Sequence, residues 1–184
     1  MSAVLEVKSL RKEFGDLVAV DGISFDIQEG EIFGFLGANG AGKTTAIRIL
    51  CGLSSPTSGE ISVAGYDVYR QREKIKRNIG YMSQKFSLYD DLTVSENIRL
   101  YAGIYGLGRK YIRRREEELL ERLRLKHIRN RLIREIPLGW KQKLAFSVAI
   151  FHNPGIVFLD EPTGGVDPLT RRQFWNLIYE ASNE

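Results

Sequence analysis

Cysteine is nearly absent from this chain, and long hydrophobic runs are missing altogether. Cys51 is the only cysteine among 184 residues, so an internal disulfide cannot form and a reducing compartment suits the composition. No stretch approaches the roughly 18 apolar residues that a membrane-spanning helix needs. Residues 1–14 also lack the apolar segment of a secretory signal. These absences exclude a disulfide scaffold and a membrane-spanning chain, and they predict a cytosolic protein.

Strong charge of either sign is also missing. The formal net charge is only +4, which permits contact with nucleic acid or anionic lipid but argues for neither. Hydrophobic residues make up 43% and charged residues 27% of the chain, as in globular proteins. The length is enough for one domain with a sizeable core. We therefore expect one globular domain, with room for a subdomain.

The first half of the chain is rich in predicted strands. Residues 23–27 alternate well, with Ile23, Phe25 and Ile27 on one face. Residues 30–37 are a short apolar run that ends in glycine, which predicts a buried strand. A helix is predicted to begin near Lys43. The other predicted strands are 3–10, 60–68 and 77–84.

From about residue 92 the hydrophobic period becomes helical. Thr93 is a predicted N-cap, with Glu96 as its capping-box partner. Asp167 is a second predicted N-cap, with Pro168 at the first helical position. The predicted helices are 92–106, 109–125, 137–153 and 167–181, and a short apolar strand at 155–162 separates the last two.

The stretch GANGAGKT has the spacing of a phosphate-binding loop: glycine, four residues, then Gly-Lys-Thr. Its glycines let backbone N–H groups converge on phosphate oxygens, and the following helix adds the positive end of its dipole. Lys43 can reach the β- and γ-phosphates, and the Thr44 hydroxyl can ligate Mg²⁺. The alternative is a glycine-rich turn that binds nothing. The predicted nucleotide-binding residues of the loop are Gly37, Ala38, Asn39, Gly40, Ala41, Gly42, Lys43, Thr44 and Thr45.

A second element of the phosphate site is a pair of acidic residues that follows the apolar run at 156–159. A buried strand can deliver Asp160 to the phosphate site, where it would hold Mg²⁺ or its waters. Glu161, one residue later, can accept a proton from the attacking water. The alternative is a strand end that is acidic by chance.

Four spaced motifs together resemble the ATP-binding subunit of an ABC transporter, and the resemblance covers nearly the whole chain. They are GANGAGKTT, YMSQKFSLYDDLTVSENI, IVFLDEP and GGVDP. The phrases SLYDDLTVSENI and GVDPLTRRQFW are most similar to the bacterial multidrug branch of exporters with ABC-2-type permeases. The resemblance implies an α/β fold, that of a P-loop NTPase: a RecA-like core, an N-terminal antiparallel β subdomain and an inserted helical subdomain. It also implies ATP and Mg²⁺ as cofactors.

The same resemblance implies roles for single residues. Phe14 occupies the place of the aromatic side chain that stacks on adenine, although it could instead be a core aromatic. Gln84 matches the glutamine that senses Mg²⁺ and the attacking water, which makes it a predicted metal-binding and catalytic residue beside Thr44, Asp160 and Glu161. Asp167 matches the loop that contacts the opposite subunit.

By resemblance, residues 1–85 and 155–184 form the nucleotide-binding core, and residues 86–154 form the helical subdomain with the signature helix. Phe86, Leu88 and Tyr89 then line a groove for a permease helix, or belong to the subdomain core. The charged helix at 109–125 is expected to present a solvated face. Headgroup contact is the next option, and nucleic-acid binding is disfavoured because aromatic side chains are sparse there.

Two departures from the family pattern stand out. Where the signature has Leu-Ser-Gly-Gly, this chain has Ile136, Pro137, Leu138 and Gly139. Proline supplies neither a hydroxyl nor an N–H to a phosphate, so we expect Gly139 and the helix start to meet the trans γ-phosphate more weakly. The second departure concerns the histidine that contacts the γ-phosphate, which in the family follows the strand ending at the position of Asp160. Both histidines of this chain precede Asp160, so neither can be that residue. The resemblance thus implies a domain incomplete at its C-terminus, poorly active by itself.

These features predict an ATPase subunit that powers export through a separate permease. It would act as a head-to-tail dimer on the inner face of the cell membrane, and nucleic acid is not expected as a partner. The alternatives are a soluble ABC ATPase without a transport role, and a nucleotide-gated regulatory module with weak or no hydrolysis. The transported substrate is not encoded here, because the permease would select it.

Overall fold

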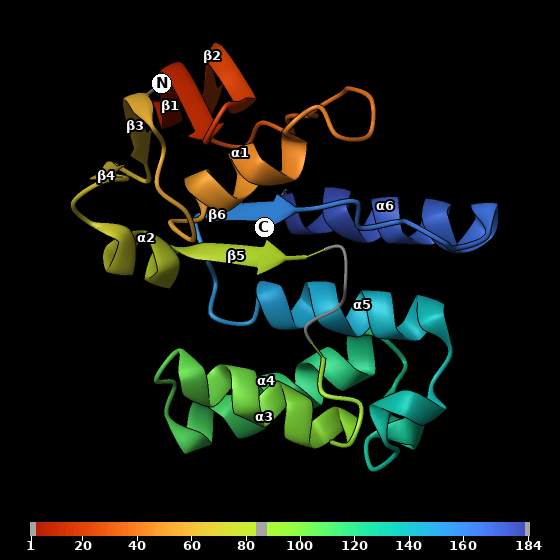
Figure 1. Ribbon diagram of the computed structural model, residues 1–184. Coiled ribbons are helices and arrows are strands. Elements are labelled where there is room, and N and C mark those ends of the chain that lie inside the picture. The colour runs from red at the N-terminus through yellow and green to blue at the C-terminus, as the bar shows by residue number, and fades with distance from the viewer. Residues whose placement is uncertain (1–2, 84–87, 183–184) are drawn as a thin grey trace. The chain divides into compact units, whose positions relative to one another are not determined.

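The computed structural model describes residues 3–83 and 88–182. The chain forms two compact units, Met1–Gly80 with Tyr179–Glu184, and Tyr81–Ile178. Figure 1 shows the elements of each. The predicted division into a nucleotide-binding core and a helical subdomain stays a prediction. Across the described ranges, no helix combines the length and the apolar character that crossing a membrane requires.

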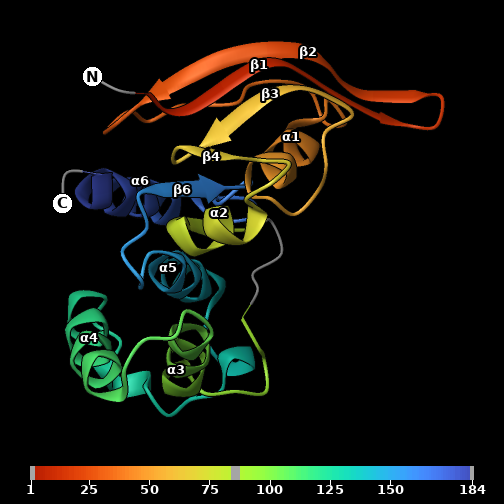
Figure 2. The same cartoon turned by 90° about the vertical axis from the view of Figure 1, so that its left-hand side faces the viewer.

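The first unit is built on an antiparallel sheet of four strands in the order β2-β1-β3-β4. The long hairpin of β1 (Ala3–Phe14) and β2 (Leu17–Gln28) forms a curved ribbon in Figure 2. β3 (Ser58–Val63) pairs with β1, and β4 (Tyr66–Asp67) pairs with β3. Alternation places Leu5 and Val7 of β1 in the core, as a sheet with one covered face requires. The predicted strands at 3–10 and 23–27 are confirmed, whereas residues 60–68, predicted as one strand, form the end of β3, a turn and β4.

The first unit also contains two helices, the start of β5 (Ile79–Met82) and the end of α6 (Pro168–Ser182) from Tyr179 on. α1 (Lys43–Leu50) begins where the sequence predicts and packs against β2. Its buried residues are Ala46, Ile47, Ile49 and Leu50, which follow the helical period. α2 is short (Arg72–Asn78) and buries only Ile75.

The buried strand predicted at residues 30–37 is wrong. Residues 31–38 form no strand, and Leu36 is 97% exposed. An apolar run becomes a buried strand only when neighbouring strands bond to it, and none of the described strands pairs with this one. Phe33 and Phe35 pack instead on Phe25 of β2, with ring centroids 5.1 and 5.2 Å from it.

The second unit is mainly helical. Its helices are α3 (Val94–Ile104), α4 (Arg109–Arg122), α5 (Leu138–Ala149) and α6 (Pro168–Ser182), with short 3₁₀ helices at Lys126–Ile128 and Ile133–Glu135. α3, α4 and α5 share one core, which includes Ile98, Leu120 and Leu144. β6 (Ile156–Leu159) pairs with β5, and the Asp160 N–H donates to the Met82 carbonyl at 2.9 Å.

The start of α3 has the predicted capping box. The Thr93 side chain accepts from the Glu96 N–H, and the Glu96 carboxylate accepts from the Thr93 N–H at 2.8 Å. These bonds lower the pKa of Glu96 below its ordinary value, the Thr93 N–H having the largest effect. They satisfy two backbone donors that would otherwise have no partner.

A buried carboxylate ties this helical core together. Glu116 of α4 is 1% exposed. It accepts hydrogen bonds from the Ser95 hydroxyl, from Arg99 Nε at 2.7 Å and from Arg129 Nη2 at 3.1 Å. Because a buried charge requires such partners, Glu116 fixes α3 and the segment after α4 to one position on α4.

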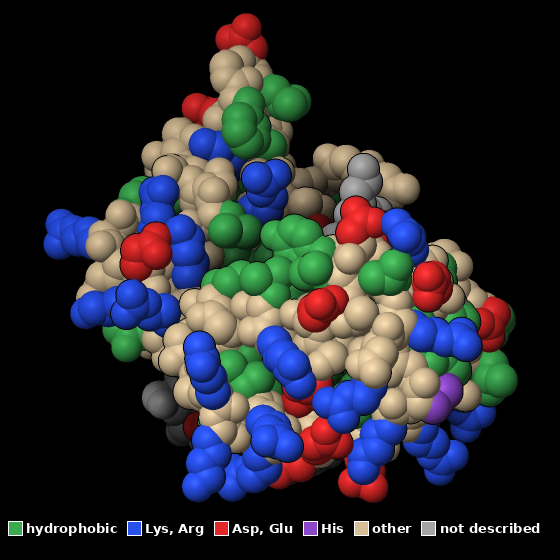
Figure 3. All heavy atoms as spheres, turned by 90° about the horizontal axis from the view of Figure 1, so that it is seen from below, with side chains coloured by type: hydrophobic (Ala, Val, Ile, Leu, Met, Phe, Trp, Pro, Cys, Tyr) green, Lys and Arg blue, Asp and Glu red, His purple; other side chains and the backbone are tan. Residues whose placement is uncertain are grey.

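Lys and Arg side chains gather toward the lower edge of the face in Figure 3, over α4, with acidic side chains among them. Arg114 and Arg115 pair with Glu118 at 3.5 and 3.3 Å, and Lys126 pairs with Glu121 at 3.1 Å. Such interspersed pairs are typical of a solvated helix face.

Candidate nucleotide site

The loop of residues 37–42 turns tightly into α1. Gly40 and Gly42 adopt φ angles of +83° and +80°, which side chains disfavour. The Lys43 ammonium closes the loop by donating to the carbonyls of Gly37 at 2.7 Å and Ala38 at 2.8 Å. One of its three N–H groups is left for a ligand. The loop therefore combines a cation with the positive end of a helix, an arrangement that favours phosphate.

Gly42 lies directly against the first sheet. A β-carbon added there would stand 2.0 Å from the Ala19 carbonyl oxygen and 3.2 Å from Val20 Cγ2. No side chain fits at this position, so the glycine is required by both its φ angle and this contact. The contact fixes the phosphate loop to the end of the β1–β2 hairpin.

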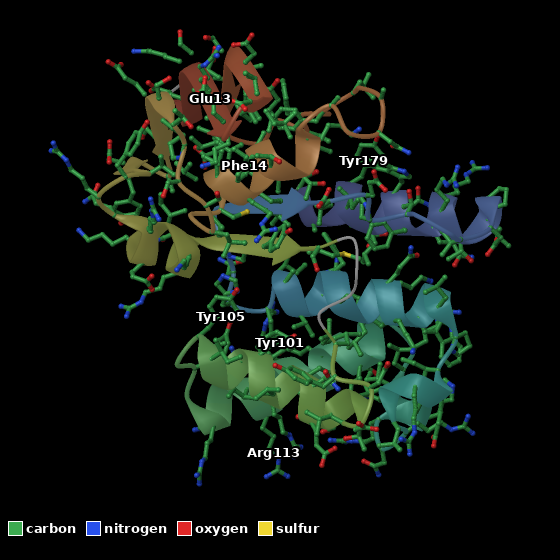
Figure 4. The ribbon with its side chains drawn as sticks, viewed as in Figure 1. Glu13, Phe14, Tyr101, Tyr105, Arg113 and Tyr179 are labelled. Atoms are coloured by element: carbon green, nitrogen blue, oxygen red, sulfur yellow. The ribbon has the colours of Figure 1, made fainter. Side chains whose placement is uncertain are left out.

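Phe14 stands at the end of β1, as Figure 4 shows, and is 54% exposed. Lys12 pairs with Val20 across the hairpin, and Val20 is the residue that faces Gly42. Phe14 is only two residues further along β1 than Lys12. Its side chain is therefore the next one on the same face of the strand, adjacent to the part of the hairpin that contacts the phosphate loop. This exposure excludes the alternative of a buried core aromatic and leaves the ring open to stacking.

Asp160 and Glu161 differ sharply in their surroundings. Asp160 is 4% exposed at the end of β6, whereas Glu161 is exposed. Glu161 also adopts a φ of +48°, which is uncommon for a residue with a side chain. Its carbonyl accepts a bond from the Gly164 N–H at 3.1 Å, which holds the turn. Such local strain is often found at functional sites.

Asp167 caps α6 as predicted. Its carboxylate accepts from the N–H groups of Leu169 and Thr170, both at 3.0 Å, and from the Thr170 hydroxyl at 2.5 Å. These bonds lower the pKa of Asp167 below its ordinary value, and the bond from the Thr170 hydroxyl has the largest effect. The cap itself is confirmed, whereas contact with a second subunit stays a prediction.

The altered signature segment leads into α5. Pro137 is the N-cap, and its carbonyl accepts from the N–H groups of Trp140 and Lys141 at 3.0 and 3.1 Å. Gly139 lies against Thr170: a β-carbon on Gly139 would stand 2.7 Å from the Thr170 Cγ2. The structure thereby brings Gly139 together with the first turn of α6, which Asp167 caps.

The Lys-Gln-Lys run after Gly139 has structural contacts. Lys141 pairs with Asp90 at 3.1 Å, and Lys143 donates to Gln173 at 2.9 Å. Gln142 is fully buried, so it is not available to a phosphate. Trp140 packs on the helical core and meets the His127 ring edge-on at 5.5 Å.

For the remaining predicted site residues, the structure gives only their exposure or no description. Thr44 is exposed in the first turn of α1, and Thr45 is half-buried. Gln84 and Phe86 lie outside the described residues. Three contacts were missed from the sequence: Ala19 at Gly42, Thr170 at Gly139 and Lys12 over Phe14. Thr170 alone had a local signal, because it follows the Asp167 N-cap by three residues.

Comparison with known proteins agrees with this geometry. Residues 20–164 match the family described as ABC transporter. The chain is 49% identical over 172 residues to the "Probable multidrug ABC transporter ATP-binding protein YbhF" of Escherichia coli, covering 94% of this chain and 30% of that protein. It is 38% identical over 184 residues to the "Bacitracin transport ATP-binding protein BcrA" of Bacillus licheniformis, covering all of this chain and 59% of that protein.

A solved structure shows the same fold. The chain superimposes on cbiO1 of Clostridium perfringens, described as part of the ABC transporter complex cbiONQ, with a TM-score of 0.88 and 27% identity. The match covers the whole of this chain and 75% of that one. The chain thus spans roughly a third to three fifths of the two curated relatives. The sequence match, the fold and the phosphate loop agree: the chain belongs to the ABC transporter family and carries its ATP-binding domain.

Proposed function

We propose that this chain binds ATP with Mg²⁺, hydrolyses it, and thereby powers export of a substrate through a separate permease. The observation that carries the proposal is the loop at 37–42, where two glycines with positive φ and a lysine precede a helix. The names of YbhF and BcrA, which refer to multidrug and bacitracin transport, support an exporter.

The residues of the phosphate loop have distinct tasks in this proposal. Backbone N–H groups of residues 38–43 would bind the β- and γ-phosphates, and Lys43 would neutralise their charge. Thr44 and Asp160 offer a hydroxyl and a carboxylate, the hard oxygen donors that suit Mg²⁺. When bound, the metal withdraws charge from the phosphates.

Glu161 is the proposed general base. It is exposed and is held in a turn with a positive φ, so its carboxylate can meet a water at the γ-phosphate. Gln84 would help to orient the same water.

A second ATP-binding domain and a permease are the proposed partners. Gly139 and the start of α5 would meet the γ-phosphate bound by the other subunit, and the Asp167 loop would contact that subunit. Gly139 and Asp167 support this assignment because both contact Thr170. Tyr89 would contact a permease helix, since it is 54% exposed, whereas Leu88 packs against the helical core. The protein would then be located at the inner face of the membrane.

The test is ATP turnover by the complete protein with its permease in membranes. Glu161→Gln should slow turnover by about 10² to 10⁴ while ATP affinity stays within about twofold, because the base acts only in the chemical step. Glu13→Gln is a matched control, since Glu13 is on β1 and pairs with Arg11. Unchanged turnover in Glu161→Gln would contradict the proposed catalytic role.

A regulatory module with little hydrolysis is the second candidate, and Pro137 favours it, because it supplies neither a hydroxyl nor an N–H to a phosphate. Turnover by the complete protein with its permease separates the two functions, and ATP-dependent dimerisation of Glu161→Gln tests the effect of Pro137. If Pro137→Ser leaves the dimerisation constant unchanged, the hydroxyl is not limiting. If the protein with its native Glu161 binds ATP but its turnover with the permease equals that of Glu161→Gln, the regulatory function holds.

A further inference from the structure

Lys12 of β1 contacts an aromatic side chain of its own strand. Its Nζ lies 4.6 Å from the centroid of the Phe14 ring, within the range of a cation–π interaction. Residues i and i+2 of a strand share one face, so this contact follows from the fold of β1.

The acidic side chains around Lys12 are engaged elsewhere. Arg11 pairs with Glu13 at 2.7 Å and also pairs with Asp21 on the neighbouring strand. Among the described residues, Lys12 has no carboxylate partner within ion-pair distance, whereas Lys8 of the same strand lies 3.9 Å from Glu60. The aromatic ring is therefore the main attraction for the Lys12 ammonium.

This contact lies next to the phosphate loop within the first unit. Lys12 pairs with Val20, and Val20 Cγ2 is 3.2 Å from the position of a β-carbon on Gly42. A nucleotide whose phosphates occupy the loop would have its base within reach of Phe14. The ring has two faces, and the ammonium covers one of them.

Resting on the proposed ATP-binding function, we propose that Lys12 is a positioning residue for adenine recognition. Its ammonium holds the Phe14 ring in place and draws electron density toward the covered face. The opposite face is then oriented and electron-poor, which favours stacking of the electron-rich adenine. Lys12 thereby acts through Phe14 and not on the phosphates.

The test compares two probes on the complete protein: ATP, and inorganic triphosphate, which lacks a base. Lys12→Met keeps the apolar stem and removes the charge. It should weaken ATP binding about two- to fivefold, the size of an exposed cation–π contact, and leave triphosphate binding unchanged. Lys12→Arg should restore ATP affinity, because guanidinium also binds an aromatic face. Lys8→Met is the matched control and should have no effect, and thermal melting should show that all the variants are folded.

A double-mutant cycle completes the design. In a Phe14→Ala background, Lys12→Met should cause no further loss of ATP affinity, because the ring through which it acts is gone. Equal weakening of ATP and triphosphate binding by Lys12→Met would overturn the proposal, since it would show a contact to phosphate. A weakening by Phe14→Ala without any effect of Lys12→Met would overturn the role of Lys12 alone. If neither substitution changes ATP affinity but Lys43→Ala does, adenine stacking on Phe14 fails while ATP binding by the loop stands.

Discussion

Gly139 and Thr170 are in contact across 31 positions of the sequence: a β-carbon on Gly139 would stand 2.7 Å from Thr170 Cγ2 and 3.5 Å from its Oγ1. The same Thr170 hydroxyl donates to the Asp167 carboxylate at 2.5 Å. The start of α5 and the start of α6 are thus fixed to each other. The altered signature keeps its glycine where the first turn of α6, capped by Asp167, requires one.

Gly139→Ala should therefore destabilise the protein even though alanine favours helices. The added methyl group overpacks the contact with Thr170, at a cost of about 1–2 kcal/mol in the free energy of unfolding. Thr170→Ser removes Cγ2 but keeps the hydroxyl for Asp167. In that background, Gly139→Ala should cost less than about 0.5 kcal/mol. Urea unfolding of the four proteins measures this coupling, and equal costs in both backgrounds would contradict the contact.

Gly42→Ala should be more damaging than other glycine substitutions in the same loop region. Its methyl group would meet the Ala19 carbonyl oxygen at 2.0 Å, and its φ of +80° adds strain. We expect a loss of about 3 kcal/mol of stability together with loss of ATP binding. Gly34→Ala is the control, because its β-carbon would meet nothing within 4 Å. Chemical unfolding and ATP titration measure both effects, and similar behaviour of the two variants would refute the close approach.

The Asp167 cap should make stability depend on acid pH. Its pKa is lowered from 3.8 by hydrogen bonds, first from the Thr170 hydroxyl, so the charged form is favoured in the folded state. A lowered pKa gives stability that is present above the unfolded-state value and is lost as the pH falls through the folded one. The wild type should exceed Asp167→Asn in unfolding free energy at about pH 6, and the difference should shrink below pH 3.8. A difference independent of pH would show that the carboxylate charge is not involved.

Glu116→Gln should weaken the helical core. The side chain is 1% exposed and binds Arg99 and Arg129, which the neutral amide would hold less firmly. We expect a cost of about 2 kcal/mol, less than for fully buried pairs because both arginines are partly exposed. Glu118→Gln, which removes exposed pairs with Arg114 and Arg115, should cost below about 0.5 kcal/mol. Thermal or urea unfolding compares them, and equal losses would contradict the special role of Glu116.

The sequence predicts correctly those structural features that depend on residues close together in the chain. The capping box at Thr93, the Asp167 cap and the start of α1 at Lys43 depend on residues only a few positions apart, so side-chain chemistry alone identifies them. The phosphate loop belongs to the same class, since glycine φ angles and one lysine define its shape.

The sequence alone does not predict features that depend on contacts between residues far apart in the chain. Residues 30–37 have the composition of a buried strand, but a strand also needs neighbours, and composition does not show which neighbours are present. The contacts of Gly42 with Ala19 and of Gly139 with Thr170 join residues more than twenty positions apart. Ala19 has no sequence signature, and the Asp167 cap that marks Thr170 does not point to Gly139, so only the folded chain shows why these glycines are required.

ATP binding by the complete protein, measured by titration calorimetry with and without Lys43→Ala, tests the central claim most directly. Lys43 contacts the carbonyls of Gly37 and Ala38 and would bind the phosphates with its remaining N–H group. The wild type should bind ATP saturably, and Lys43→Ala should lose at least about tenfold in ATP affinity, as for a charge-assisted hydrogen bond. Lys8→Ala should bind ATP like the wild type. Equal ATP affinity in the wild type and Lys43→Ala, or no ATP binding by the wild type, would contradict the account.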